Sequence, residues 1–284
     1  MTDTLPAAGG RIDKADQLPA GVRAPLRDLV LVLADSKRVL GLRYSERMLG
    51  APTLEAGISA SSMAQDEWGH ARLTYALLSE FGDDPKALEH ERPAAAYRSM
   101  PALDRRFESW SDLVAASLLA DTALSVQYAA LADSRYTPVR NRVQKLLDEE
   151  RFHFQYAAGW TRRIAAAEAV RGGLGEALAR MLPHVLLWFG RGDLAGAARL
   201  VEEGFVAEGP DALRVRLLSR VAPVLAEAGL AEVAGLAHRA GGWEHVRELD
   251  WVGWDEATRR EGGALDEETA ARARGDKNRA LLLD

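Results

Sequence analysis

Four segments of helical character, each more than 20 residues long, restrict this chain to a bundle of packed helices. They cover about residues 25–49, 53–81, 109–133 and 138–170. An average globular helix has about 11–12 residues, so segments of this length indicate helices that pack side by side along their whole length. The sequence shows neither convincing strand alternation nor an internal repeat. We therefore expect an all-α fold.

The remainder of the chain is read as two tails and a set of additional helices. Residues 1–24 are rich in Pro, Gly and Asp, and they predict an N-terminal tail. Residues 25–260 are expected to form one helical domain, with extra helices over 174–240 after the bundle. Residues 261–284 are expected to be a C-terminal tail.

Composition excludes several classes of site. The 284 residues contain no cysteine, which excludes disulfides, thiolate zinc sites and iron-sulfur clusters. Any metal must then be held by His and carboxylates, which suit iron and manganese. A net charge of -6 gives no indication of nucleic-acid binding. The chain has no apolar run of the ~20 residues that span a bilayer and no signal-peptide pattern at its start, so we expect a cytoplasmic protein without membrane contact.

Two Glu-x-x-His strings are the strongest functional signal. One runs from Glu67 to His70 and the other from Glu150 to His153. On an α-helix the side chains of residues i and i+3 project from the same face. Two such pairs on two long helices match the half-sites with which four-helix bundles hold a di-iron or di-manganese centre. The sequence therefore predicts a dinuclear metal site.

Such a site also needs one carboxylate from each of the other two bundle helices. Glu46 shares a helical stripe with apolar residues of the first segment, and Asp121 shares one with apolar residues of the third. Both are therefore predicted to point inward, whereas Asp66 and Glu149 point about 100° away from the ligands beside them and are expected at the surface or in support of the ligands. The predicted ligands, in chain order, are Glu46, Glu67, His70, Asp121, Glu150 and His153, and their four carboxylates are the predicted catalytic groups.

With these residues in place, the chain resembles the phenylacetic acid catabolic protein family, which includes the A and C subunits of bacterial phenylacetyl-CoA epoxidase. The matching strings are residues 33–46, 51–55, 64–72, 119–121, 149–153 and 159–160. The resemblance implies a ferritin-like bundle and assigns the same six residues as metal ligands. A later run over 187–204 resembles the C subunit, a structural partner with degraded ligands, whereas the complete ligand set is typical of the O2-activating A subunit.

The main functional hypothesis is a di-iron monooxygenase or epoxidase acting on an aromatic or CoA-thioester substrate, with manganese as the alternative metal. The chain has no Gly-x-Gly-x-x-Gly fingerprint for a flavin or nicotinamide cofactor, so an external reductase should supply the electrons. A homologous subunit is a further expected partner in a homo- or hetero-oligomer. Two other hypotheses stay open at this point, a non-catalytic C-type subunit and a ferritin-like iron-handling protein.

Overall fold

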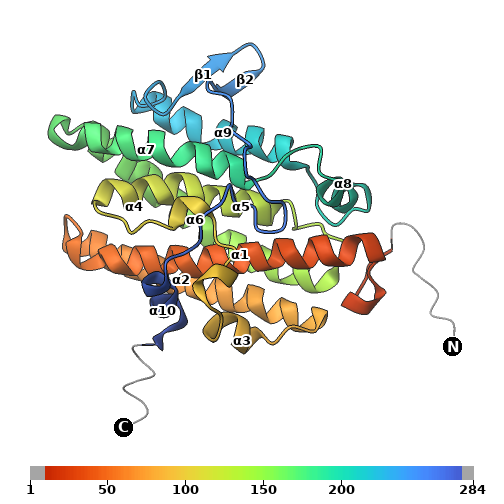
Figure 1. The fold of residues 1–284 in the computed structure, drawn as a ribbon. Coiled ribbons are helices and arrows are strands. Elements are labelled where there is room, and N and C mark those ends of the chain that lie inside the picture. The colour runs from red at the N-terminus through yellow and green to blue at the C-terminus, as the bar shows by residue number, and fades with distance from the viewer. Residues whose placement is uncertain (1–9, 277–284) are drawn as a thin grey trace, which may run out of the picture.

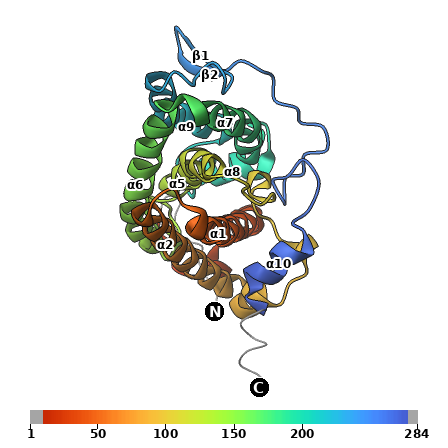
Figure 2. The same ribbon diagram turned by 90° about the vertical axis from the view of Figure 1, so that its left-hand side faces the viewer.

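The protein folds as a bundle of long helices, as a computed structural model that describes residues 10–276 shows. Figure 1 shows the helices running side by side, and Figure 2 looks along them. The four bundle helices expected from the sequence are confirmed, and so is the all-α ferritin-like class. They are α1 (Ala20–Arg47), α2 (Leu54–Leu78), a third helix made of α4 (Trp110–Ala116), η6 (Ser117–Asp121) and α5 (Thr122–Ala129), and α6 (Thr137–Ala165).

Local capping sets where these helices begin. The Thr53 side chain accepts a hydrogen bond from the backbone N–H of Ala56 and so caps α2. Ser109 and Asp112 form a capping box at the start of α4. The first helix begins at Ala20, five residues before the predicted start, because Val22 is buried in the core and continues the apolar face of α1.

The third bundle helix contains one π-helical turn, η6, which ends at Asp121. Single π-turns inside α-helices are rare, and they occur frequently at functional sites. The turn re-aims the side chains that follow it, and all five of its residues are buried. It therefore brings the carboxylate of Asp121 into the centre of the bundle.

Further elements cover the bundle. They are α3 (Pro85–His90), α7 (Glu168–Trp188), α8 (Ala195–Glu202), α9 (Pro210–Glu227), β1 (Leu236–Arg239), β2 (Gly242–His245), α10 (Glu267–Arg274) and the short 3-10 turns η1 (Ala15–Gln17), η2 (Met48–Gly50), η3 (Ser79–Phe81), η4 (Ala94–Ala96) and η5 (Pro101–Leu103). The helices predicted within 174–240 correspond to α7, α8 and α9.

The prediction of helix up to residue 240 is wrong at its end. Gly229 has a φ of 64°, which ends the helical path after α9, and β1 then pairs with β2 as an antiparallel hairpin. The loop of two residues between paired Arg239 and Gly242 is the commonest hairpin connection. The expectation that the chain has no strands is therefore corrected at this hairpin.

Both predicted tails are partly built into the fold. Ile12 is buried and forms a β-bridge with Tyr136, so the segment from residue 10 onward packs against the bundle. At the other end α10 packs against α1, where Arg38 Nε donates to the carbonyl oxygen of Ala273 at 2.7 Å. The rest of the predicted tails, residues 1–9 and 277–284, lies outside the described residues. Within the described part, none of the helices is long and apolar enough to cross a membrane.

A prediction about packing follows from two helical glycines. A Cβ at Gly41 of α1 would lie 2.7 Å from the Trp68 ring and 3.0 Å from the carbonyl oxygen of Ala64, both on α2, whereas a Cβ at Gly69 would meet no atom within 4 Å. Gly41→Ala should therefore lower the free energy of unfolding by about 1–3 kcal/mol through overpacking. Gly69→Ala, the matched control, should raise it by about 0.5–1 kcal/mol. Urea unfolding measures both, and equal effects would contradict the packing described between α1 and α2.

Candidate metal centre

A cluster of buried acidic and histidine side chains lies inside the bundle. Glu67 from α2, Asp121 from η6, and Glu150 and His153 from α6 each offer one ligand atom, and these four atoms lie within 4.8 Å of one another. All four side chains are buried. Four of the six residues singled out in the sequence therefore come together, and they could hold a metal ion.

The ammonium group of Lys37 lies in the middle of this cluster. Its Nζ donates hydrogen bonds to Asp121 Oδ1 at 2.7 Å, to Glu150 Oε1 at 2.5 Å and to Glu67 Oε1 at 3.0 Å. The Lys37 side chain is fully buried. A lysine ammonium has three N–H donors and no acceptor, and here each donor meets a different carboxyl group. Lys37 therefore holds the position in which a bound cation would neutralise the carboxylates.

The charges of the cluster shift the pKa of its members. Burial alone disfavours the charged form of Lys37, but Asp121, Glu150 and Glu67 outweigh it and raise the pKa of Lys37 well above its usual value. Burial would raise the pKa of Asp121, yet Lys37 and the hydrogen bond from His153 lower that pKa well below its usual range. Burial and the neighbouring Asp121 raise the pKa of Glu67 to about 7. At neutral pH the centre thus contains an ammonium group and at least one permanent carboxylate.

His153 supplies a second cation. Its Nδ1 lies 3.1 Å from Asp121 Oδ2 and 3.2 Å from Glu67 Oε1, and its Nε2 lies 3.2 Å from Asp66 Oδ2. Burial opposes protonation, but the hydrogen bonds to Asp121 and Glu67 prevail and raise the pKa of His153 to about 12. The imidazole is therefore protonated at neutral pH, and both of its N–H groups face carboxylates.

His70 makes the corresponding contacts from α2. Its Nε2 lies 2.7 Å from Glu149 Oε2, and its Nδ1 lies 3.1 Å from Glu150 Oε1. Burial opposes protonation here as well, but the interactions with Glu150 and Glu67 raise the pKa of His70. Glu149 is about 40% exposed, so His70 connects the buried carboxylate to one at the surface.

Asp66 and Glu149 have a defined role in this arrangement. Each precedes the Glu of one Glu-x-x-His string and contacts the His of the other string, on the opposite helix. Asp66 of α2 pairs with His153 of α6, and Glu149 of α6 pairs with His70 of α2. Asp66 and Glu149 thus do not join Glu67 and Glu150 in the cluster. Because α2 packs against α6, each instead reaches the histidine of the other helix. In the sequence, these two pairs are indicated by an acidic residue directly before the Glu of each string, in Asp66-Glu67 and in Glu149-Glu150.

The structure corrects the position expected for Glu46. Its carboxylate lies outside the cluster and pairs with Arg43 Nη1 at 3.0 Å and with Arg272 Nη1 at 2.7 Å. Glu46 follows Lys37 by nine residues, which is about 900°, or half a turn more than two full turns, so the two side chains project from opposite faces of α1. Glu46 therefore lies on the side of α1 that meets Arg272 of α10, and not at the cluster.

The side chains that α1 does bring to the cluster are Lys37 and Tyr44. They are seven residues apart and therefore share a face of the helix. The hydroxyl of Tyr44 donates to Asp121 Oδ2 at 3.0 Å. Lys37 was missed in the sequence, although it stands on a helical stripe with Leu33 and Leu40, where a lysine without a partner would be costly. A charged residue on an otherwise apolar helical stripe is the sequence signal that indicates a buried lysine with acidic partners.

Two ligand-type atoms of the cluster lack a well-formed hydrogen bond. These atoms, Glu67 Oε2 and His70 Nδ1, are buried, and neither has a hydrogen-bond partner of acceptable geometry among the described residues. Both lie near charged groups, since Glu67 Oε2 is 2.9 Å from Lys37 Nζ and His70 Nδ1 is 3.1 Å from Glu150 Oε1. Buried polar atoms are usually satisfied, so these two are the positions at which an ion would gain contacts.

Comparison with known proteins identifies the family. A sequence profile of the family described as Phenylacetic acid catabolic protein matches residues 1–273. The chain belongs to this family. Within the phenylacetic acid catabolic proteins, it is 26% identical over 215 residues to the C subunit of 1,2-phenylacetyl-CoA epoxidase from Escherichia coli (strain K12), across 75% of this chain and 86% of that protein. The family resemblance seen in the sequence is confirmed.

The contacts of Lys37 make a prediction about stability. Lys37→Met keeps the length of the side chain but leaves three buried carboxyl groups without their ammonium partner. In chelator-containing buffer at pH 7, it should lower the free energy of unfolding by about 3–5 kcal/mol, because breaking a buried ion pair leaves an uncompensated charge in a poor solvent. Urea unfolding measures this. Lys145→Met, at an exposed position of α6, is the control and should change stability by less than about 0.5 kcal/mol. Similar values for the two variants would show that Lys37 does not stabilise the cluster.

Proposed function

We propose that this chain is a structural, non-catalytic subunit of a multicomponent oxygenase of the phenylacetyl-CoA epoxidase type, and that it associates with a homologous catalytic subunit. The observation that carries the proposal is Lys37. A carboxylate-bridged dinuclear centre requires a carboxylate from the first bundle helix, and α1 presents an ammonium group in that position instead. The similarity to the C subunit of the Escherichia coli epoxidase supports the same assignment.

The residues as they stand do not fit a dinuclear centre. The carboxylates of the cluster would attract divalent ions. The ammonium of Lys37, however, already forms hydrogen bonds with the three carboxyl groups, those of Glu67, Asp121 and Glu150. A fixed positive charge at 2.5–3.0 Å from the ligand oxygens repels any further cation placed among them. Glu46, the carboxylate expected to complete the set, is held by Arg43 and Arg272. The chain thus lacks one ligand and carries a competing cation.

In this proposal the function of the cluster is to hold the bundle helices together. Lys37 connects α1 to α2, η6 and α6 through one group, and the cross-helix pairs of His70 and His153 add a second set of contacts between α2 and α6. Buried charges that are fully paired fix the register of the elements that carry them. A rigid bundle of this kind presents a defined surface to a partner.

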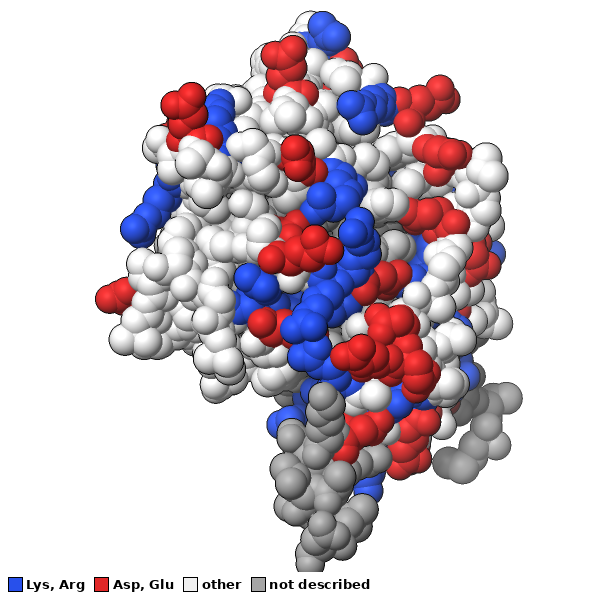
Figure 3. Space-filling model, turned by 60° about the vertical axis from the view of Figure 1, so that its left-hand side comes forward, with Lys and Arg blue, Asp and Glu red and all other residues white. Residues whose placement is uncertain are grey.

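The surface supports association with another protein. Figure 3 shows a run of basic side chains down the middle of one face, with acidic side chains beside it and a broad area without charged side chains on its left. At the corner between α1 and α2, the apolar side chains of Leu49, Leu54 and Ile58 are 93%, 77% and 61% exposed. Several large apolar side chains exposed together are typical of a surface that another protein covers.

A second candidate function is the di-iron oxygenase expected from the sequence. It is favoured by the two atoms without good hydrogen bonds, Glu67 Oε2 and His70 Nδ1, and by the convergence of the ligand-type atoms of Glu67, Asp121, Glu150 and His153. A bound di-iron centre would supply O2 activation, with electrons from an external reductase and an aromatic or CoA-thioester substrate. Lys37 would then have to leave the cluster, and Glu67, His70, Asp121, Glu150 and His153 would be the ligands.

The two candidates differ in what Glu67→Gln does to the assembled enzyme. The variant keeps the shape of the side chain and removes a carboxylate of the cluster. If this chain has a structural role, the substrate-dependent O2 consumption of the complex with its catalytic homologue should change by less than about threefold. A metal-ligand role should instead reduce it by about 100-fold or more, since even residues that only support metal ligands are worth 10–100-fold.

The assay needs two controls. Gel filtration of the mixture shows that the variant still associates, and thermal unfolding shows that it is folded. This chain assayed without its homologue should not consume O2 in response to substrate. A large loss of activity in a folded, assembled Glu67→Gln complex, or substrate-dependent O2 consumption by the isolated chain, would overturn the proposal of a structural role.

A further inference from the structure

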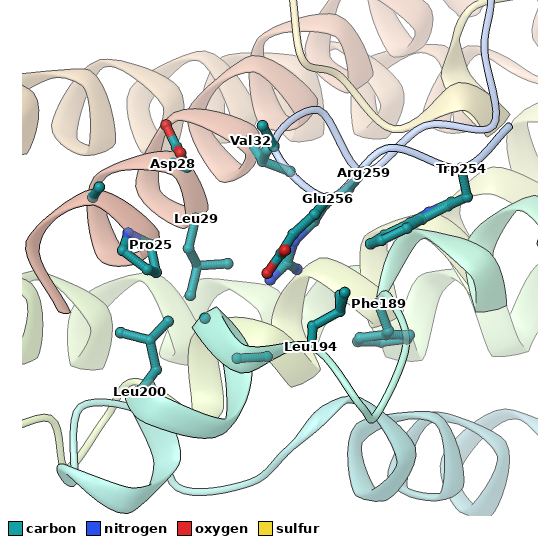
Figure 4. A pocket seen from close by; sticks show the side chains of 14 residues that line it. Pro25, Asp28, Leu29, Val32, Phe189, Leu194, Leu200, Trp254, Glu256 and Arg259 are labelled. Atoms are coloured by element: carbon teal, nitrogen blue, oxygen red, sulfur yellow. The ribbon is translucent and has the colours of Figure 1, made fainter. Parts of the chain in front are cut away.

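A cavity separate from the acidic cluster lies between the start of α1, α8 and the C-terminal segment that folds back over them. It has a volume of about 290 Å³. Its walls are mostly apolar and include Leu29 of α1, Phe189 after α7, Leu194 before α8, and Trp254 of the C-terminal segment (Figure 4). Ligand pockets are typically about 300–1,000 Å³, and this cavity, at the lower end of that range, would hold only a compact molecule of about one ring.

Arg259 brings a positive charge into this cavity. Figure 4 shows its side chain extending from the C-terminal segment toward the space between α1 and α8. Its Nη1 donates to the amide oxygen of Gln127 at 3.3 Å, and the guanidinium lies 5.6 Å from the centre of the Trp188 ring. Within residues 10–276, no carboxylate lies within 4.0 Å of this guanidinium. Burial lowers the pKa of Arg259 to about 10, which leaves the group charged at neutral pH.

The backbone holds Arg259 in an unusual conformation. Its φ is 53°, and it is the one non-glycine residue with positive φ in the described chain. The residues around it are fixed, because the backbone N–H of Asp255 donates to the carbonyl oxygen of Arg260 at 2.7 Å, and Arg260 forms an ion pair with Asp104. A left-handed residue is normally glycine or asparagine, and strained residues of this kind cluster at ligand sites. The residue with the strained backbone is therefore also the one whose guanidinium the fold directs toward the cavity.

The acidic groups of the cavity leave this charge available. Asp28 is already paired with Arg27 Nη1 at 3.0 Å and with Arg98 Nη1 at 2.7 Å. Glu256 is exposed, and it acts on Arg259 only through space by raising its pKa. Within the described residues, the buried arginines Arg43 and Arg260 each have a carboxylate partner, Glu46 and Asp104 respectively. Arg259 has none in the described residues, and an anion is the group that would satisfy it.

We propose that this cavity binds a small monocarboxylate with a flat apolar body, whose carboxylate pairs with the guanidinium of Arg259 while the body packs against Leu29, Phe189 and Trp254. Arginine is suited to this task because its planar fork of N–H donors matches the two oxygens of a carboxylate. The apolar walls favour a ring or a short chain over inorganic anions. The proposal concerns a site on another part of α1 and does not depend on the function of the acidic cluster.

The test is direct binding to the full chain by isothermal titration calorimetry, with benzoate as the probe. Benzyl alcohol has a similar shape without the charge, and inorganic phosphate has the charge without the apolar body. Arg259→Gln removes the guanidinium. Arg259→Gly also removes it and relieves the left-handed backbone, so the melting temperature of this variant should stay within about 2 °C of the parent or rise. Glu256→Gln removes the nearby negative charge and keeps the cavity.

The proposal requires saturable binding of benzoate that is at least about 10-fold tighter than that of benzyl alcohol or phosphate. It also requires a loss of at least about 10-fold in both Arg259 variants and a gain of about two- to fivefold in Glu256→Gln. Equal binding of benzoate and benzyl alcohol, or benzoate binding unchanged in Arg259→Gln, would overturn it. A parent protein that does not bind benzoate would overturn it as well. A large fall in the melting temperature of Arg259→Gly would then show that the guanidinium serves only to stabilise the fold.

Discussion

The contact between one buried ammonium group and three carboxyl groups is the interaction on which the centre of this protein depends. Lys37 joins Glu67, Asp121 and Glu150, and through them α1 joins the three other helices of the bundle. Taking these groups out of water would be prohibitive for any of them alone, and it is tolerated because every charge meets an opposite one. Two further features position Asp121 for this contact. The π-helical turn η6 ends at Asp121, and the hydroxyl of Tyr44 donates a hydrogen bond to its carboxylate.

This contact changes the meaning of the Glu-x-x-His strings. The motif describes a face of a helix that carries a carboxylate and an imidazole, and such a face can bind a metal or form ion pairs with its neighbours. In this chain each histidine lies between a buried carboxylate and a surface carboxylate from the opposite helix, His70 with Glu149 and His153 with Asp66. In the structural role that we propose, the ammonium of Lys37 supplies the positive charge that a metal would otherwise bring. The membership of the phenylacetic acid catabolic protein family is compatible with both uses of the motif.

The long helices and most of the cluster could be predicted from the sequence, because periodicity and spacing are local properties. Glu67, Asp121, Glu150 and His153 converge because each lies on the inward face of its helix. The stripe that contains Glu46 does not show which side of α1 faces the cluster, and Glu46 lies on the opposite side, where Arg43 and Arg272 of α10 pair with it. Nothing in the periodicity of the first helix predicts a helix over Glu267–Arg274 that supplies Arg272. The hairpin after α9 and the inward turn of Arg259 depend on backbone conformations that no periodicity encodes.

The central claim is that the ammonium of Lys37 takes the place of metal in the cluster. Iron content after anaerobic loading with Fe(II) and removal of loosely bound metal tests it most directly, with the parent chain compared with Lys37→Glu. The account predicts less than about 0.1 iron per parent chain and at least about one iron per Lys37→Glu chain, because that variant removes the competing cation and adds the carboxylate that a dinuclear site requires of the first helix. A parent chain that retains about two iron ions would contradict it.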